Sequence, residues 1–175
     1  MHYATIKWTD IANGEGVRIS LFVSGCTHRC KNCFNEIAWD FDYGQPFDNR
    51  TAEKILEELS SSYISGLSLL GGEPLEPQNQ QALYPFIQEV KRRFPHKTIW
   101  CYTGFVFDEK TGTLRETHKN TPITKDLIAL FDVLVDGPFI EELKNICLKF
   151  RGSSNQRVID VQKTLQQSEC VLYME

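Results

Sequence analysis

The chain has 175 residues, of which 41% are hydrophobic and 24% charged, and its formal net charge is −4 at pH 7. These values predict one soluble domain, and the acidic balance gives no reason to expect nucleic acid as a partner. The N-terminus has no apolar signal core, and no run approaches the ~18 apolar residues of a membrane span, so we expect a cytoplasmic protein without a membrane partner.

The first predicted element is a buried strand over residues 19–23, which are mostly β-branched, aliphatic or aromatic. Cys26, Cys30 and Cys33 follow it in the pattern C-x3-C-x2-C. Three thiolates at this spacing can hold one metal centre, but no fourth cysteine stands where a closed structural site would need one. We therefore predict a metal centre with one open position, where a further ligand binds and reacts.

The other three cysteines are isolated in the sequence. Cys101 and Cys147 have apolar neighbours and are predicted to be small buried side chains, and Cys170 has no predicted role. Because Cys26, Cys30 and Cys33 fall within eight residues, the pattern favours a metal site over disulfides.

After the cysteine loop, Thr51 is the predicted N-cap of a helix. The apolar face of this helix repeats at helical spacing through Ala52, Ile55, Leu56 and Leu59. A second buried strand is predicted over residues 64–70, and it ends at the turn Gly71-Gly72-Glu73-Pro74. Another helical face follows, formed by Leu83, Phe86, Ile87, Val90 and Phe94. Pro85 lies inside this pattern, so the start of the helix stays open.

Residues 98–102 and 133–135 predict two more strands, separated by a helix over about residues 124–131. The alternation of strands and helices predicts an α/β fold with a mainly parallel sheet, whose functional loops meet at the carboxyl ends of the strands. A complete eight-fold barrel typically takes ~250 residues, so we expect an open, partial parallel β/α barrel. Its unclosed side would admit the loop of another protein.

The cysteine pattern after the first strand, combined with Gly-Gly-Glu-Pro after the second, resembles the radical S-adenosylmethionine superfamily. The resemblance implies one [4Fe-4S] cluster held by Cys26, Cys30 and Cys33, with S-adenosylmethionine bound to the fourth iron. It also implies that the reduced cluster cleaves this cofactor to methionine and a 5'-deoxyadenosyl radical, which abstracts a hydrogen atom.

The same resemblance implies where the cofactor binds. The adenine contact is expected at Asn32, Cys33 and Phe34, through their backbone groups and the Phe34 ring. The methionine end is expected at Gly71, Gly72 and Glu73, where a carboxylate and backbone carbonyls can accept from its ammonium group. Many superfamily members carry an aromatic residue just before the third cysteine, whereas this chain has Asn32 there and Phe34 just after it.

Four further segments narrow the resemblance, namely residues 10–16, 44–47, 133–137 and 151–157. With them, residues from about 7 to 160 resemble the activating proteins of class III, anaerobic ribonucleoside-triphosphate reductases, and residues 161–175 form a short tail of the single domain 1–175. The resemblance implies an oxidoreductase that generates a glycyl radical on the large reductase subunit. It also implies an electron donor such as flavodoxin or ferredoxin.

Polar residues in the last of these segments have two interpretations. Arg151, Ser153, Asn155 and Arg157 are candidate donors to the incoming glycine loop or to the cofactor, and they also fit a polar surface turn. Asp136, in Asp-Gly-Pro at the end of a strand, has the same ambiguity.

Three alternatives stay open at this stage. The chain could activate a different glycyl-radical enzyme, although it lacks the inserted cysteine-rich segment of larger activases. It could be a non-enzymatic iron-sulfur or zinc interaction module, with the three cysteines joined by His28 or by a distant cysteine. The Gly-Gly-Glu-Pro segment could also be a plain turn between strand and helix.

Overall fold

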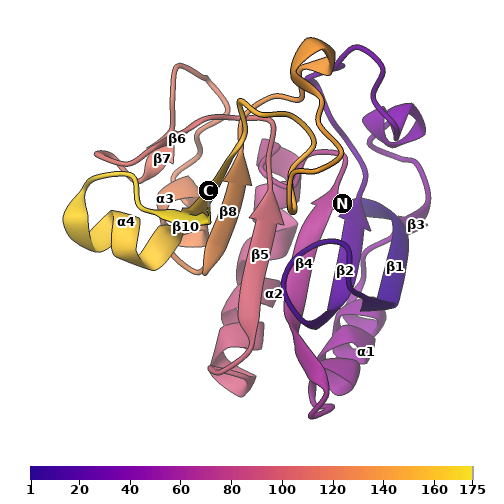
Figure 1. Ribbon diagram of the computed structural model, residues 1–175. Helices are drawn as coiled ribbons and strands as arrows, with labels where there is room; N and C mark the ends of the chain where they lie inside the picture. Colours follow the sequence, from indigo (N-terminus) through magenta and orange to yellow (C-terminus); the bar gives the residue numbers. More distant parts are fainter. Residues whose placement is uncertain (175) are drawn as a thin grey trace.

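The structure, a computed structural model that describes residues 1–174, is built around one eight-stranded sheet with the order β10-β9-β8-β5-β4-β2-β1-β3 (Figure 1). The four central strands are mutually parallel, and two antiparallel strands extend the sheet at each side. The central strands are β2 (Val17–Val23), β4 (Ile64–Gly71), β5 (Thr98–Tyr102) and β8 (Val133–Asp136). The outer strands are β1 (His2–Asp10), β3 (Gln45–Pro46), β9 (Arg157–Asp160) and β10 (Leu172–Met174).

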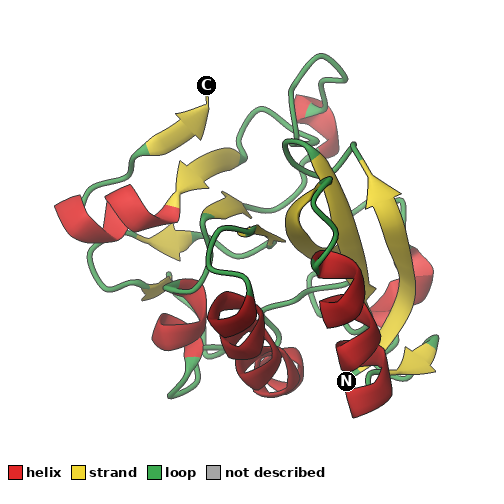
Figure 2. Ribbon diagram, turned by 90° about the horizontal axis from the view of Figure 1, so that it is seen from below, coloured by secondary structure: helices red, strands yellow, loops and turns green. Residues whose placement is uncertain are grey.

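Helices connect the central strands and cover one side of the sheet (Figure 2). They are α1 (Asn49–Leu59), α2 (Pro77–Arg93) and α3 (Thr124–Ile128), while α4 (Val161–Gln167) joins β9 to β10. A two-stranded hairpin of β6 (Phe107–Asp108) and β7 (Thr113–Leu114) follows β5. The predicted α/β fold with a mainly parallel central sheet is therefore confirmed.

Two predicted helix boundaries are wrong. Asp48, not Thr51, caps α1, because its carboxylate accepts a hydrogen bond of 2.8 Å from the Thr51 backbone N–H. The helix α3 ends at Ile128 rather than Phe131, since the backbone N–H groups of Leu130 and Phe131 bond to the carbonyls three residues earlier, as in a 3-10 turn, instead of continuing the α-helix. The start of α2, left open by the sequence, lies at Pro77, and Pro85 is accommodated inside the helix.

The antiparallel outer strands were not predicted from the sequence. The segment 161–175, interpreted as a tail, contributes α4 and β10, and β10 pairs with β9 in the same sheet. The strand β1 pairs along most of its length with β2, so the N-terminus also belongs to the sheet.

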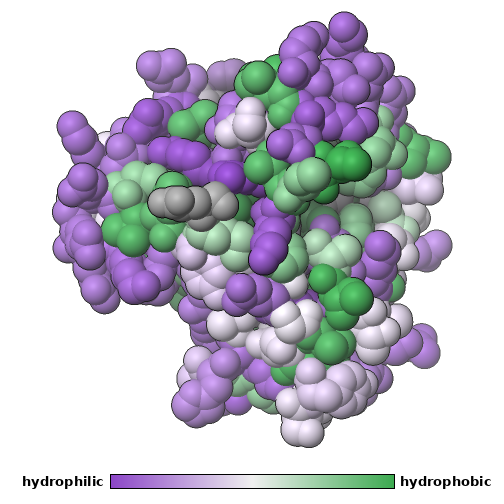
Figure 3. All heavy atoms as spheres, in the orientation of Figure 1, coloured by the Kyte–Doolittle hydropathy of each residue, from purple (hydrophilic) through white to green (hydrophobic). Residues whose placement is uncertain are grey.

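The two faces of the central sheet bury different side chains. On the helix side, alternate residues such as Ile19, Leu21 and Leu69 pack with α1 and α2 in a continuous apolar core. The opposite face carries a smaller apolar cluster around Trp100 and a buried Arg18. Seen from that side, hydrophobic groups form several patches between hydrophilic ones (Figure 3). Among residues 1–174, no helix combines the length and apolar character needed to cross a membrane.

Candidate metal centre and its cavity

A cavity of about 530 Å³ lies at the carboxyl ends of the central strands. The loops after β2, β4, β5 and β8 all contribute to its lining, so the predicted gathering of these loops at one rim is confirmed. The residues predicted in the cysteine loop and in the glycine turn all line this one cavity: Cys26, Cys30, Asn32, Cys33, Phe34, Gly71, Gly72 and Glu73. Their roles toward a cluster or cofactor stay predictions.

The cysteine loop has two parts that are held differently. At its start, Gly25 and Cys26 donate backbone hydrogen bonds to the carbonyls of Ala38 and Trp39, at 2.8 and 3.2 Å. Farther along, the hydrogen bond between backbone groups is local and runs from the Cys33 N–H to the Cys30 carbonyl at 3.2 Å. Asn32 has a φ of 57°, in the left-handed region, and lies exposed at the rim. The part of the loop around Cys30 and Cys33 thus has no backbone-to-backbone hydrogen bond to another element within residues 1–174.

The three thiols are partly buried beside the cavity. Burial raises the pKa of Cys26 to about 12 and also raises that of Cys30. The Cys26 and Cys30 thiols therefore hold their protons at neutral pH unless a metal ion replaces them.

The arrangement of side chains does not fit a single zinc ion. Within the described residues 1–174, no three histidine, cysteine, aspartate or glutamate side chains converge closely enough to hold one ion. A zinc ion needs all its ligand atoms within ~2.0–2.3 Å of one point. In a [4Fe-4S] cluster each thiolate binds a different iron, so three separated cysteines on one cavity fit that group. His28, the suggested fourth zinc ligand, is instead bound to Glu73.

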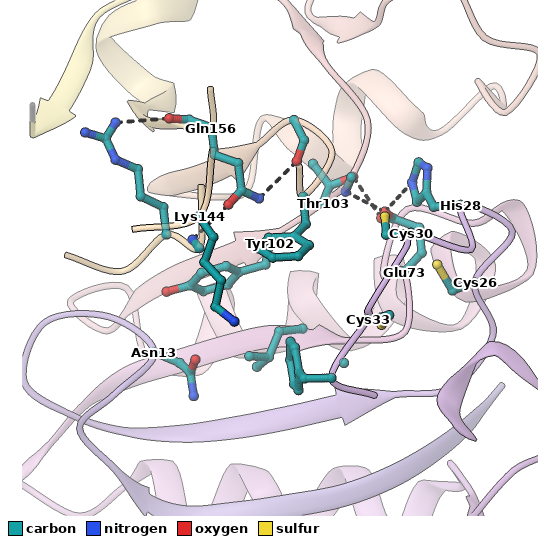
Figure 4. A pocket seen from close by; sticks show the side chains of 18 of the residues that line it. Asn13, Cys26, His28, Cys30, Cys33, Glu73, Tyr102, Thr103, Lys144 and Gln156 are labelled. Atoms are coloured by element: carbon teal, nitrogen blue, oxygen red, sulfur yellow. Dashed lines mark hydrogen bonds and ion pairs between the residues drawn. The ribbon is translucent and has the colours of Figure 1, made fainter. Parts of the chain in front are cut away.

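Glu73 is 1% exposed, and both of its carboxylate oxygens are occupied by other parts of the protein. Oε1 accepts from the Leu75 N–H and the Thr103 hydroxyl, each at 2.8 Å. Oε2 accepts from the Gly104 N–H at 2.8 Å and from His28 Nε2 at 2.9 Å (Figure 4). This carboxylate ties together the cysteine loop and the loops after β4 and β5, while the backbone of its turn borders the cavity.

Burial opposes protonation of His28, but the hydrogen bond and the negative charge of Glu73 outweigh it and raise the pKa of His28. The His28 ring also packs against Phe105, with ring centroids 4.3 Å apart. His28 is therefore a fixed part of the cavity wall.

The two glycines of the turn are required by close packing within the protein. Gly71 has a φ of +108°, which favours glycine, and a Cβ atom on Gly72 would lie 2.7 Å from the Gly25 carbonyl oxygen. The turn also donates backbone hydrogen bonds to Val23 at 2.7 Å and to Gly25 at 2.8 Å. These contacts set the turn directly against the end of β2 and the first cysteine.

Two buried polar atoms on cavity-lining residues have no hydrogen-bond partner within residues 1–174, namely Trp39 Nε1 and Tyr102 Oη. Unpaired polar atoms are costly in a protein interior, so their presence here favours a ligand with hydrogen-bonding groups. Lys144 and Asn13 lie at the same end of the cavity as Tyr102 (Figure 4). Of Trp39, Tyr102, Lys144 and Asn13, only Tyr102 could be expected here from the sequence, because it lies at the carboxyl end of a predicted strand.

The segment 151–157 uses its polar groups mainly to build the loop that borders the cavity. Gln156 Oε1 accepts from the Gly152 and Ser153 N–H groups, and its Nε2 donates to the Gly137 carbonyl at 3.0 Å. Asn155 donates to Pro138, and Arg151 donates to the Gln156 carbonyl. The interpretation as a polar turn accounts for these bonds, although Arg151, Gly152 and Gln156 also line the cavity.

Asp136 and Arg157 form a partly buried ion pair outside the cavity, with Arg157 Nε 2.9 Å from Asp136 Oδ1. Asp136 also accepts a hydrogen bond of 2.8 Å from the Phe107 N–H, in the hairpin after β5. Both residues thus join β8 and β9 to that hairpin.

The isolated cysteines follow the predictions only in part. Cys101 is fully buried in the core, as predicted. The prediction for Cys147 is wrong, because it lies exposed in the irregular loop before β9, where its neighbour Ile146 is 92% exposed. Apolar neighbours indicate burial only where the backbone forms a strand or helix that packs on the core.

Comparison with known proteins identifies relatives across nearly the whole chain. Residues 12–159 match the family described as a 4Fe-4S single cluster domain. A relative from Haemophilus influenzae is 43% identical over 158 residues, covering 89% of this chain and 96% of its own length. Relatives from Escherichia coli K12 and phage T4 are 39% and 38% identical, covering 90% of this chain and 97% and 93% of their own lengths. All three are anaerobic ribonucleoside-triphosphate reductase-activating proteins.

Proposed function

The chain belongs to the family of anaerobic ribonucleoside-triphosphate reductase-activating proteins, and from this we propose that it is a radical S-adenosylmethionine enzyme. Its substrate is the large subunit of the reductase, on which it generates a glycyl radical. It acts in the cytoplasm as an oxidoreductase and takes its electron from a donor protein such as flavodoxin or ferredoxin.

The observation that carries this proposal is the meeting of three cysteines and the Gly71-Gly72-Glu73 turn on one cavity. Cys26, Cys30 and Cys33 would each hold one iron of a [4Fe-4S] cluster and leave the fourth iron open. Bound there, S-adenosylmethionine would take an electron from the cluster and yield methionine and a 5'-deoxyadenosyl radical, which takes one hydrogen atom from the glycine Cα.

The residues of this chain would bind and orient the reactants. The backbone of Gly71, Gly72 and Glu73 lies against the start of the cysteine loop, so it is suited to the methionine end of the cofactor. Asn32, Cys33 and Phe34 would meet the adenine. The Phe34 side chain is 87% exposed at the mouth, so it has an open ring face available for stacking.

The fold supports access for a protein substrate. We propose that the sheet is the open, partial β/α barrel typical of this superfamily, with the cavity on its inner side. Tyr102, Asn13 and Lys144 border the cavity away from the cysteines, where an incoming main chain would find hydrogen-bonding partners. Activation of a different glycyl-radical enzyme is the alternative, and family membership favours the ribonucleotide reductase.

The first test concerns the cluster ligands. Protein reconstituted with iron and sulfide without oxygen, then supplied with dithionite and S-adenosylmethionine, should form methionine and 5'-deoxyadenosine. Replacing Cys26, Cys30 or Cys33 by alanine should abolish both products, because each change removes one iron ligand. Cys147→Ala is the matched control and should retain the wild-type rate, since Cys147 is exposed and does not line the cavity. Product formation in all three ligand variants would contradict the mechanism.

The second test concerns the substrate. The same mixture with the large reductase subunit should give the doublet of a glycyl radical in electron paramagnetic resonance. No doublet should form with the Cys30→Ala variant. If protein that cleaves S-adenosylmethionine produces no doublet on a competent reductase, the substrate assignment is wrong.

A further inference from the structure

The turn that starts α2 contains a second buried carboxylate that also reaches the cysteine loop. Glu73 and Glu76 are three residues apart and each is 1% exposed. Glu73 contacts His28, and Glu76 contacts the preceding residue, Thr27. Two carboxylates from one turn therefore hold two consecutive residues directly after the first cysteine.

The bonds of Glu76 are all directed away from its own helix. Its Oε1 accepts from the Thr27 backbone N–H at 3.0 Å and from the Thr27 hydroxyl, and its Oε2 accepts from Lys119 Nζ at 3.0 Å. Glu76 is the N-cap residue of α2, a position where side chains usually accept from the helix backbone, yet it makes no such bond. Its side chain is used for the cysteine loop instead.

The charge of Glu76 is maintained in spite of its burial. Burial alone would raise its pKa, but the hydrogen bonds from Thr27 and Lys119 outweigh this and lower it. Lys119 provides the opposite charge, and its side chain is only 20% exposed. Hydrogen bonds to an ionised, partly desolvated carboxylate are stronger than those between neutral groups.

These contacts fall on both sides of Cys26. Before it, the Gly25 carbonyl accepts from the Glu73 N–H at 2.8 Å, and after it Thr27 is held by Glu76. Within residues 1–174, no buried carboxylate contacts the residues beside Cys30 and Cys33, and Lys31 makes only an exposed ion pair of 3.9 Å with Glu142. The first cysteine is thus held in place by buried carboxylates of the turn after β4, whereas the residues beside the other two cysteines have no such support.

We propose that Glu76 is a positioning residue for Cys26, which it fixes through Thr27, with Lys119 as its counter-charge. The identity of the metal group depends on the function proposed above, but the contact between Glu76 and Thr27 belongs to the protein without it. As a consequence of this contact, Cys26 is held in a fixed position relative to the Gly71-Gly72-Glu73 turn before any iron binds.

Thiol alkylation of the metal-free, reduced protein tests this directly. Iodoacetamide labelling of each cysteine is followed over time by mass spectrometry in the wild type, in Glu76→Gln and in Thr27→Val. Exposed Cys147 serves as the fast internal standard and buried Cys101 as the slow one. Glu53→Gln is the matched control, because it also removes a carboxylate, but one that pairs with Arg93 and lies away from the cysteine loop.

Relative to Cys147 in the same sample, Cys26 should be labelled about tenfold faster in Glu76→Gln, because loss of charge-assisted bonds favours local opening. Thr27→Val should produce a smaller rise, since only the hydroxyl bond is lost. Rates for Cys101, and for Cys26 in Glu53→Gln, should match the wild type. If Glu76→Gln also speeds the labelling of Cys101, the whole fold has loosened, and the proposal is then judged on Thr27→Val alone. A Cys26 labelling rate within about twofold of wild type would overturn the proposal, in Glu76→Gln when Cys101 stays protected and in Thr27→Val when it does not.

A second measurement uses the reconstituted protein. Iron release to a ferrous chelator should be faster in Glu76→Gln than in Glu53→Gln, because the Cys26 ligand dissociates more readily. An unchanged release rate would count against the proposal. Neither measurement requires cleavage of S-adenosylmethionine or the reductase, so failure of this inference can be distinguished from failure of the proposed function.

Discussion

At the scale of single residues, Arg18 places a guanidinium in the interior between β2, β4 and β5, where it is 1% exposed. Its five hydrogen bonds of 2.7–3.1 Å go to neutral acceptors on Glu15, Leu67, Ser68 and Thr98. Burial lowers the pKa of Arg18 to about 10, which still leaves it charged at neutral pH. Arg18 thus joins three strands and the loop before β2.

Replacement of Arg18 by methionine tests the contribution of this network. We expect the free energy of unfolding to fall by about 3 kcal/mol or more, because several buried acceptors lose a charged donor. Urea denaturation measures the change. Arg115→Met is the control, since Arg115 is 43% exposed and pairs with Glu109, and its loss should change stability by at most about 1 kcal/mol. An Arg18→Met effect as small as the control would contradict this account.

The residues of the candidate site differ in how far the sequence predicts them. The cysteines and the Gly71-Gly72-Glu73 turn were predicted because metal ligands and glycine turns have a local spacing. Trp39 and Glu76 were not, because their roles depend on neighbours from distant strands and loops, and Tyr102 was indicated only by its position at the end of a strand. Glu73 shows most clearly what the sequence does not reveal. Four donors occupy its carboxylate, and three of them come from parts of the chain that are distant in sequence.

At the scale of elements, the loop between β8 and β9 shapes one wall of the cavity, and Gln156 makes three of the hydrogen bonds that hold it. Gln156 closes this loop by accepting from Gly152 and Ser153 and donating to Gly137. Apart from a 3-10 turn at 141–143 and one isolated bridge, this segment has no regular structure. Its conformation therefore depends strongly on the Gln156 amide.

Gln156→Ala should loosen this loop without unfolding the sheet. We expect proteolysis within residues 139–156 to become roughly tenfold faster, because several local bonds are lost together. Limited proteolysis of the metal-free protein, with fragments identified by mass spectrometry, measures this rate. Gln88→Ala, at an exposed position on α2, should be cleaved like the wild type. Equal rates in the two variants would mean that Gln156 does not hold the loop.

The helices show why boundaries are harder to predict than the existence of elements. The apolar faces of α1 and α2 were predicted from their spacing, and these faces pack on the core. The N-cap of α1 was assigned to Thr51 because threonine is a common capping residue, but Asp48 supplies the capping oxygen three residues earlier. Both residues fit the pattern, and only the path of the entering chain distinguishes them.

At the scale of the whole molecule, the central strands were predictable and the outer strands were not. The central strands are buried on both faces and therefore appear as continuous apolar runs. In contrast, β3, β9 and β10 have two to four residues each, too few for a clear period. Their place in the sheet is decided by pairing with β1 and β8, which no local pattern shows.

The last strand closes the face of the sheet opposite the helices. Tyr173 of β10 packs edge-on against Trp100, with ring centroids 5.4 Å apart, and Met174 joins the same apolar cluster. The Tyr173 hydroxyl donates to Glu15 at 2.7 Å, which links the C-terminal strand to the loop before β2. The C-terminal strand and the loop before β2 are therefore held together beside Trp100.

Removal of residues 169–175 should uncover this face, because β10 would be lost while the central strands remain. We expect faster acrylamide quenching of tryptophan fluorescence, as Trp100 becomes accessible, and a free energy of unfolding lower by about 1–3 kcal/mol. Tyr173→Phe is the matched control: it keeps the ring against Trp100 but loses the exposed bond to Glu15, so it should leave quenching unchanged and reduce stability by less than about 1 kcal/mol. Quenching that is equal in the truncated and full-length proteins would show that β10 does not cover Trp100.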